Sequence, residues 1–260
     1  MNKRILIAVA VIFLLIDCVL FTVKLNQEHK PKPIHKAKPH YKYSIYLTSD
    51  DGPLLGSKNL NHLIKDYEVP LSLFLVGQNI IKDPKLEAYL EDYKNNPYVI
   101  LANHSFSHAN LHYKRFYKNP SNVEADFLKG EETLGLNYKI ARLPGRNVWV
   151  LNQELQKGEP NALRAAKKLY QDYGYRVFGW DYELRHNGKG KILKDAKTHY
   201  ENIKKLLKSG KTYQKNQIVI LMHDQMFTNS ASTKVLGELI LLLQNDDECK
   251  LKLIKDYKIN

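Results

Sequence analysis

The chain has 260 residues, of which 43% are hydrophobic and 26% charged, and its formal net charge is +13. This length and apolar content suffice for one sizeable domain. A basic chain invites a nucleic-acid partner, but the lysines are spread along the whole sequence and no nucleic-acid-binding motif occurs, so no such partner is expected. Solubility and attraction to anionic glycans or lipid head groups explain the charge equally well.

The first 23 residues have the composition of a targeting segment. Lys3 and Arg4 precede a run from Ile5 to Val23 that is apolar apart from Asp17 and Thr22. The run is long enough for a membrane span and longer than the core of a short signal peptide, although a carboxylate in mid-span is unfavourable. Residues 1–23 are therefore expected to be a membrane anchor or a signal segment.

Residues 24–42 differ from both of their neighbours. Pro31, Pro33 and Pro39 stand among lysines and histidines, a composition typical of an extended, self-repelling linker. The lysines of this segment outnumber Lys3 and Arg4, and the positive-inside rule would keep the lysine-rich side in the cytosol. One domain, residues 43–260, is expected to follow.

The first chemically distinctive segment is Asp50-Asp51-Gly52-Pro53, directly after the apolar run Tyr43–Leu47 and Thr48-Ser49. Adjacent carboxylates raise each other's pKa unless a cation neutralises one of them. One aspartate would then hold a metal while the other stays free for proton transfer beside it. Taken alone, the segment also fits an ordinary turn, since Asp, Gly and Pro are common turn residues.

A histidine pair follows another strand-like run, Tyr98–Ala102. His104 and His108 are four residues apart, a spacing that places both on one face of a helical turn, and His112 repeats the spacing. One Asp and two His would leave a coordination position open, as in catalytic rather than structural zinc sites. Chance spacing explains an isolated pair, and the two aspartates strengthen the metal interpretation.

A third polar segment, Met222-His223-Asp224, ends the apolar run Gln217–Leu221. A histidine at a strand end fits a half-buried structural role. It also fits a general acid that a nearby carboxylate keeps protonated.

Strand-like runs alternate with helical stretches along the domain. The runs end near Thr48, Val76, Ala102, Arg142, Gly179, Met222 and Ile254, and helices are expected around residues 121–128, 161–169 and 235–243, with Ser121 and Glu124 as a capping box for the first. Such alternation predicts a parallel sheet. About seven strands favour an open or distorted (β/α) barrel, in which the polar segments above would meet at the carboxyl ends of the strands.

The three polar segments, in this order, resemble the motifs of the polysaccharide deacetylase family, the NodB-homology group of carbohydrate esterase family 4. Residues 48–53 read T-S-D-D-G-P for the family's T-F-D-D-G-P, residues 104–108 fit H-[ST]-x-x-H, and residues 221–223 fit L-x-H. Two motifs match in part: residues 142–146, with Gly145 where an aromatic is usual, and residues 180–183. The resemblance covers roughly residues 43–255 and implies an α/β fold, a distorted seven-stranded (β/α) barrel of NodB-homology type.

The resemblance also implies a division of roles at one site. Asp51, His104 and His108 would hold one divalent cation, and this donor set suits zinc, with cobalt or nickel as alternatives. Asp50 would be the general base, and Arg142 would pair with it and keep it ionised.

Further roles follow from the weaker motifs. His223 would donate a proton to the leaving amine, with Glu183, or failing it Asp181, holding it in the charged form. The backbone N–H of Gly145, next to Pro144, would help to stabilise the oxyanion. Glu183 and Asp181 also fit simple surface acids, and Trp149 and Trp180 fit either a sugar platform or the buried core.

The function implied is a metal-dependent hydrolase that removes N-acetyl groups from sugars of a cell-envelope or extracellular glycan. An O-acetyl sugar esterase is an alternative, because the same site handles esters. A glycan-binding pseudoenzyme is another, and the intact motif residues argue against it. Because the family is usually exported, the enzyme is expected to be anchored in the inner membrane by residues 1–23 and to face outward, or to be secreted if that segment is cleaved.

Overall fold

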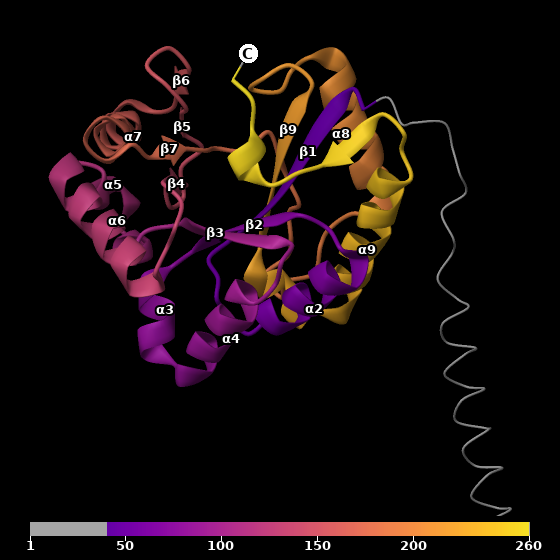
Figure 1. Ribbon diagram of the computed structural model, residues 1–260, viewed down its shortest axis with the longest axis horizontal. Coiled ribbons are helices and arrows are strands. Elements are labelled where there is room, and N and C mark those ends of the chain that lie inside the picture. Colours follow the sequence, from indigo (N-terminus) through magenta and orange to yellow (C-terminus); the bar gives the residue numbers. More distant parts are fainter. Residues whose placement is uncertain (1–40, 260) are drawn as a thin grey trace, which may run out of the picture. The chain divides into compact units, whose positions relative to one another are not determined.

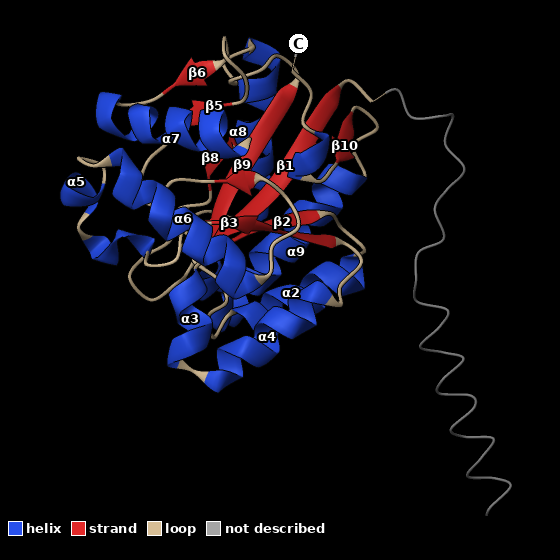
Figure 2. Cartoon of the chain, turned by 60° about the vertical axis from the view of Figure 1, so that its left-hand side comes forward, coloured by secondary structure: helices blue, strands red, loops and turns tan. Residues whose placement is uncertain are grey.

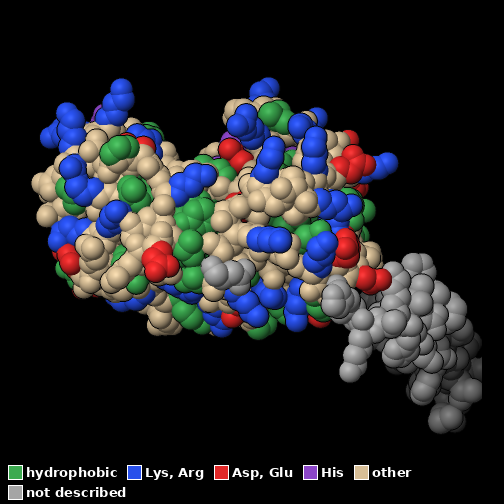
Figure 3. All heavy atoms as spheres, turned by 90° about the horizontal axis from the view of Figure 1, so that it is seen from above, with side chains coloured by type: hydrophobic (Ala, Val, Ile, Leu, Met, Phe, Trp, Pro, Cys, Tyr) green, Lys and Arg blue, Asp and Glu red, His purple; other side chains and the backbone are tan. Residues whose placement is uncertain are grey.

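The computed structural model describes residues 41–259. The expected anchor at residues 1–23 and nearly all of the linker at residues 24–42 lie outside this range, so both stay predictions. Between residues 41 and 259, none of the helices has the length and apolar character needed to cross a membrane. Figure 3 shows one face of the molecule, on which Lys and Arg side chains are dispersed among acidic and uncharged ones rather than gathered in one patch.

Seven parallel strands form the central sheet. In spatial order they are β7 (Arg176–Val177), β4 (Ile140–Ala141), β3 (Val99–Asn103), β2 (Leu71–Leu75), β1 (Tyr43–Asp50), β9 (Gln217–His223) and β8 (Tyr182–Glu183). Beyond β7, the antiparallel strands β5 (Trp149–Val150) and β6 (Gln156–Lys157) extend one edge. The long strands β1 and β9 lie side by side at the centre (Figures 1 and 2).

The expected α/β barrel is confirmed as a curled, open sheet, with one change in its membership. The run that ends near Ile254 was expected to be the seventh strand, but β10 (Cys249–Leu251) pairs only with the start of β1 and lies off the main path. The seventh barrel strand is instead β8, which has only two residues and no periodicity that a sequence could reveal. β7 and β8 are consecutive in sequence but lie at opposite ends of the row of parallel strands. Residues 178–181 therefore connect the two strands that would pair in a closed barrel.

Helices cover the outside of this sheet (Figure 2). The α-helices are α2 (Ser57–Tyr67), α3 (Gly77–Lys82), α4 (Pro84–Lys94), α5 (Tyr113–Phe116), α6 (Pro120–Leu134), α7 (Pro160–Tyr173), α8 (Ala196–Ser209) and α9 (Ser230–Gln244), with 3₁₀ turns η1 (His108–Leu111), η2 (Asp224–Thr228) and η3 (Ile254–Asp256). The three expected helices correspond to α6, α7 and α9. The expected capping box of α6 is wrong: Asn119 caps the helix by accepting a hydrogen bond from the Ser121 N–H at 3.1 Å, because Pro120 takes the first helical position.

Alternation along the central strands separates the helix-facing core from the barrel interior. In β1, Ile45 and Leu47 belong to the cluster under the helices, whereas Tyr46 belongs to an interior cluster with Phe74 and Val219. Successive side chains of a strand point to opposite faces. The interior face of β1 therefore continues from Tyr46 to its last residue, Asp50, and the sheet delivers that carboxylate to the mouth of the barrel.

Candidate active site

Asp50 and His223 end the two central strands at the same level. The parallel register pairs Asp50 directly with His223, two residues beyond the pair Thr48 and Leu221. Neighbouring strands are about 4.8 Å apart, so the sheet itself places these two residues next to each other. Asp50 is buried and His223 is half-buried.

Asp51 is turned away from the strand by its backbone. Its φ of 70° lies in the left-handed region, and Gly52 follows at once. A Cβ atom on Gly52 would lie 2.4 Å from the carboxylate oxygen Oδ2 of Asp224, so only glycine fits at this point. The reversal explains how two consecutive aspartates can take different places, one in the barrel interior and one at its rim.

Next to this turn, the buried carboxylate of Asp224 links β1, α2 and α4. It accepts hydrogen bonds from the hydroxyls of Ser49 at 2.5 Å, Ser57 at 2.5 Å and Tyr93 at 2.7 Å. Ser49 stands where the family motif has phenylalanine, and this hydrogen bond gives the serine a structural role. Burial raises the pKa of Asp224, although the three hydroxyl donors lower it in part.

The segment that carries His104 and His108 is an irregular turn, which corrects the expectation of a helical turn. Ser105 has a φ of 72°, and four consecutive residues from His108 to Leu111 have φ between 46° and 63°. The Ser105 hydroxyl accepts the N–H of His108 at 3.0 Å. The Asp126 carboxylate of α6 accepts the N–H groups of Phe106 and Ser107, each at 3.1 Å. Hydrogen bonds to the Ser105 and Asp126 side chains therefore bring the two histidines together. Regular helical spacing does not account for their proximity.

Asp51, His104 and His108 converge on one point. Oδ1 of Asp51 lies 3.4 Å from Nε2 of His104 and 3.1 Å from Nε2 of His108. One ligand atom from each residue lies within 4.8 Å of the others. His112, the third histidine of the series, is exposed and belongs to no such group within residues 41–259.

These contacts fit a divalent cation. Ligand atoms at about 2.0–2.1 Å around a tetrahedral ion are about 3.3 Å apart, which matches the separations in this cluster. Nδ1 of His104 lies 2.9 Å from the backbone oxygen of Arg142, and such a bond fixes the ring so that Nε2 faces the cluster. One carboxylate and two imidazoles are donors that zinc, cobalt and nickel accept.

The charges in the cluster support one another. Burial acts to raise the pKa of Asp51, but hydrogen bonds from His104 and His108 outweigh it and hold the pKa well below its usual range. Burial acts to lower the pKa of His104, but the charges of Asp50 and Asp51 outweigh it and raise the pKa. In both cases the neighbours outweigh the cost of desolvation.

Arg142 lies directly behind Asp50 and is fully buried. Its Nη1 donates to Oδ1 of Asp50 at 2.7 Å and to the Thr48 hydroxyl at 2.8 Å. Its other nitrogens donate to the backbone oxygens of Phe178 at 3.2 Å and Gly179 at 2.9 Å. The pairing implied by the sequence is therefore present, and the same guanidinium also links β1 to the connection between β7 and β8.

Gly145 lies beside the cluster, under an aromatic ring from another element. Its φ is 62°, and a Cβ atom there would lie 3.0 Å from two ring carbons of Tyr113. The ring of Tyr113 in turn meets the ring of His108 edge-on, with centroids 5.8 Å apart. Within the described range the N–H of Gly145 makes no hydrogen bond, while the carbonyl of the preceding Pro144 accepts the hydroxyl of Tyr117 at 2.7 Å.

The expected partners of His223 are not found next to it. Oε2 of Glu183 lies 3.7 Å from Nε of Arg185. Asp181 accepts the N–H groups of Tyr213 at 2.6 Å and Val219 at 2.8 Å, and burial raises its pKa to about 6. Since backbone donors occupy Asp181 and β8 pairs Glu183 with Leu221 rather than with His223, neither carboxylate reaches the histidine.

The actual neighbour of His223 is another histidine. Nδ1 of His223 is buried and has no hydrogen-bond partner in the described residues. The ring of His186 lies against the His223 ring, with centroids 5.8 Å apart in an edge-on arrangement. His186 itself lies 2.7 Å from the backbone oxygen of Asn187 through Nδ1 and 3.3 Å from Gln225 through Nε2.

The two tryptophans differ in position. Trp149 is buried and stacks on Tyr213 with ring centroids 4.3 Å apart, so it belongs to the core. Trp180 is half-buried and lines a cavity of about 530 Å³ together with Asp181 and Glu183.

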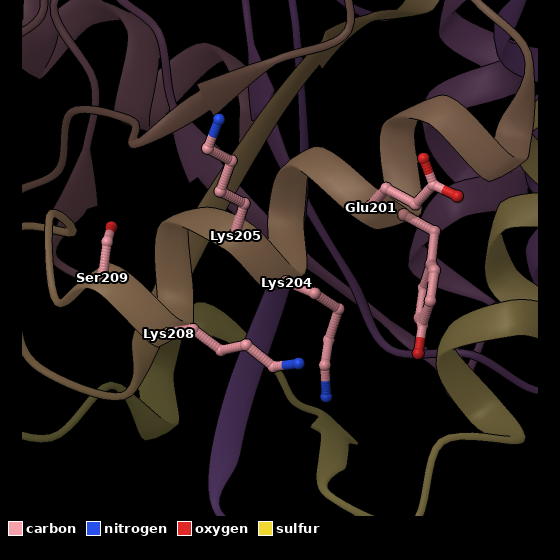
Figure 4. A pocket seen from close by; sticks show the side chains of 6 residues that line it. Glu201, Lys204, Lys205, Lys208 and Ser209 are labelled. Carbon is pink, nitrogen blue, oxygen red and sulfur yellow. The ribbon is translucent and has the colours of Figure 1, made fainter.

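Another cavity lies away from the predicted site residues. It measures about 580 Å³ and follows α8, where it is lined by Tyr200, Glu201, Lys204, Lys205, Lys208 and Ser209. Figure 4 shows Lys204 and Lys208 extending to one side of the helix and Lys205 to the other. Lys204 already forms ion pairs with Asp246 and Glu248 at 2.6 Å and 2.8 Å. We therefore place the chemistry at the Asp51 cluster and not in this cavity.

Sequence reasoning missed three residues that shape the site. Asp126 and Asp224 act through buried hydrogen bonds to remote segments, and no local pattern predicts such contacts. Tyr113 follows His112 in an unremarkable polar stretch. The only sequence features that pointed to these contacts were Asp224, next to His223, and Ser49, where the family motif has phenylalanine.

The sequence model that describes polysaccharide deacetylases matches residues 37–171. This match covers more than half of the chain and includes the two aspartates, both cluster histidines and Arg142. The chain belongs to the polysaccharide deacetylase family. A comparison with curated proteins finds no match.

Solved structures of this family share the fold. The catalytic domain of a peptidoglycan N-acetylglucosamine deacetylase from Eubacterium rectale is 19% identical, with a TM-score of 0.61, over 88% of this chain and 97% of that one. A family 4 carbohydrate esterase from Streptomyces lividans is 19% identical, with a TM-score of 0.57, over 84% and 94%. A polysaccharide deacetylase from Bacillus cereus is 22% identical, with a TM-score of 0.52, over 83% and 94%. At these identities the likeness establishes the fold of this deacetylase and not its substrate.

Proposed function

We propose that this polysaccharide deacetylase removes N-acetyl groups from sugars of a cell-envelope or extracellular glycan and that it uses one divalent cation. The observation that carries the proposal is the Asp51, His104 and His108 cluster next to the buried pair of Asp50 and Arg142. A ligand set beside a separate carboxylate is the arrangement that metal-assisted hydrolysis of an acyl group requires.

The residues divide the work as follows. A cation held by Asp51, His104 and His108 would supply a Lewis acid that polarises the acetyl carbonyl and makes water more acidic. Asp50 takes the proton of the attacking water, and Arg142 fixes the orientation of its carboxylate through the 2.7 Å hydrogen bond. The N–H of Gly145 is available to the oxyanion, since donors aimed at developing charge stabilise the transition state.

The position of His223 supports an amide as the substrate. An amine leaves only when its nitrogen is protonated, whereas an activated ester needs no such help. His223 stands beside Asp50 in the strand register, and in the proposed reaction it donates that proton as the C–N bond breaks. Acetate and a free amino sugar are the balanced products of this step.

Acetate release from matched N-acetyl and O-acetyl sugar oligomers tests the proposal. We expect turnover of the N-acetyl oligomers, which chelation abolishes and zinc restores. Turnover of the O-acetyl substrates alone would indicate a sugar esterase. A purified protein that binds glycan but neither retains metal nor releases acetate would be a pseudoenzyme.

We also propose that residues 1–23 anchor the enzyme in the inner membrane with the catalytic domain outside the cytoplasm. The support is the apolar run Ile5–Val23 ahead of a Pro- and Lys-rich linker. Protease added to intact spheroplasts should remove the domain. If degradation requires lysis, the excess of lysines after the run has kept the domain inside.

A further inference from the structure

A further cavity borders Tyr113, the residue whose ring contacts His108 of the metal-binding cluster. It measures about 400 Å³ and is lined by Tyr113, Lys114, Tyr117, Lys118, Arg146, Glu159 and Asn161. Tyr113 connects the two places, because its ring also meets the ring of His108 and covers Gly145. A chain of sugars bound at the cluster could therefore pass over this tyrosine into the cavity.

The arginine of the cavity is held in place by aromatic rings. The guanidinium carbon of Arg146 lies 5.5 Å from the ring centroids of both Tyr113 and Tyr117. Its Nη1 donates to the backbone oxygen of Gly145 at 2.8 Å. These contacts fix the side chain without neutralising its charge, since the rings and the carbonyl carry no net charge.

The balance of charge in the cavity is positive. Lys114 and Lys118 are exposed and form no ion pair in the part of the chain that the structure describes. The one acid, Glu159, caps α7 by accepting the N–H of Ala162 at 2.9 Å, and its Oε1 lies 3.6 Å from Nε of Arg146. Three cations thus face one carboxylate, which lies beside Arg146, and the charges of Lys114 and Lys118 are not balanced by an acid in the cavity lining.

We propose that this cavity is a subsite for a sugar with an anionic substituent, a carboxylate or a phosphate, adjacent to the N-acetylated sugar that is cleaved. The inference rests on the proposed function and narrows its substrate to acidic glycans. A planar guanidinium fits a carboxylate or phosphate in two-point contact. The aromatic face of Tyr113 provides the apolar surface on which a sugar ring can rest.

The test compares three oligomers of equal length, one of neutral N-acetylated sugars, one in which alternate sugars carry a carboxylate, and one in which they carry a phosphate. With the full-length protein, kcat/KM should be higher for at least one acidic oligomer than for the neutral one. In Arg146→Gln and in Lys118→Gln, that advantage should fall about tenfold, mainly through KM, because one charge-assisted hydrogen bond contributes roughly one factor of ten. In Lys118→Gln, turnover of the neutral substrate should change by less than about twofold.

The control is Lys205→Gln, which removes an exposed charge from α8 outside this cavity. Calorimetric binding of the acidic oligomers gives a second readout that does not depend on turnover, and raising the salt concentration should weaken it. Equal losses for neutral and acidic oligomers in both variants, or no preference for either acidic oligomer in the wild type, would overturn the inference. If no N-acetyl oligomer releases acetate, the proposed function fails, and acidic-oligomer binding that Arg146→Gln abolishes would still support the subsite.

Discussion

Arg142 and Asp50 form a buried ion pair, with Nη1 and Oδ1 2.7 Å apart, at the carboxyl end of the central strand β1. The same guanidinium donates to Phe178 and Gly179 in the connection between β7 and β8. A single side chain therefore orients the proposed general base and links β1 to the connection between β7 and β8. Loss of this residue should affect both stability and catalysis.

Arg142→Met should destabilise the fold by about 3–5 kcal/mol, because it leaves the buried Asp50 carboxylate without its guanidinium partner. Urea denaturation measures the loss. Arg142→Met with Asp50→Asn should recover part of it, since the second change removes the uncompensated charge. No recovery in the double variant would mean that the contacts with Phe178 and Gly179, and not the ion pair, carry the stability.

A soluble protein beginning near Tyr41 should carry about one divalent ion per chain, most readily zinc. His104→Ala and His108→Ala should each lose it, as measured by elemental analysis after dialysis. His112→Ala is the matched control, because it has the same spacing but lies outside the cluster. Full metal retention in both cluster variants would exclude this ligand set.

Asp50→Asn and Asp51→Asn should separate the roles of two adjacent and chemically identical residues. Asp50→Asn should keep the metal and lose activity by about a hundred- to ten-thousand-fold, the usual effect of removing a general base. Asp51→Asn should lose both metal and activity. Metal content and acetate release, measured on the same samples, check the prediction. Metal loss in Asp50→Asn would show that it is a ligand itself.

His223→Ala should lose a hundred- to ten-thousand-fold in the rate of N-acetyl hydrolysis and much less with an activated acetate ester, whose leaving group needs no proton. The comparison is made with both substrates in the one variant. An equal loss with both substrates would leave His223 as an orienting or structural residue. His186→Phe, which keeps a ring beside His223, provides a further comparison for the neighbour that replaces the expected carboxylate.

The loss of folding stability at low pH should depend in part on Asp246. Burial alone would raise the pKa of this carboxyl, but hydrogen bonds from Lys204, the Glu248 N–H and Tyr200 lower it to about 2. Because the folded pKa lies below the unfolded value of about 3.9, this group contributes stability above pH 4 that is lost as the pH falls towards 2. Asp246→Asn should therefore be less stable than the wild type at pH 7, and the difference should shrink towards pH 2 in urea denaturation. Asp92→Asn, at an exposed carboxylate with no ion pair in the described residues, is the control.

The main residues of the site were predictable from sequence, because each lies in a short motif at the end of a strand. Asp50, Asp51, His104 and His108 lie in such segments, and so does His223. The barrel was predictable for a similar reason, since apolar runs such as those of β1 and β9 are long enough to reveal their period. Two-residue strands such as β8 carry no such signal.

The remaining residues of the site depend on contacts between segments far apart in the chain. Asp224 accepts the hydroxyl of Tyr93, 131 residues away, and Tyr113 covers Gly145 from another element. The partner expected for His223 was wrong for the same reason. A carboxylate near the right position in sequence cannot be assigned to a histidine until its competing donors, here the N–H groups of Tyr213 and Val219, are known.

The left-handed run from His108 to Leu111 limits how this active site can change. Each non-glycine residue in this conformation costs roughly 1–2 kcal/mol, and four occur in succession. Substitution of this run by strong helix formers would favour right-handed backbone conformations. These would move His108 away from the carboxylate of Asp51. Substitutions at Ala109 and Asn110 should therefore be poorly tolerated, although neither residue belongs to the motif, with glycine as the residue most readily accepted there.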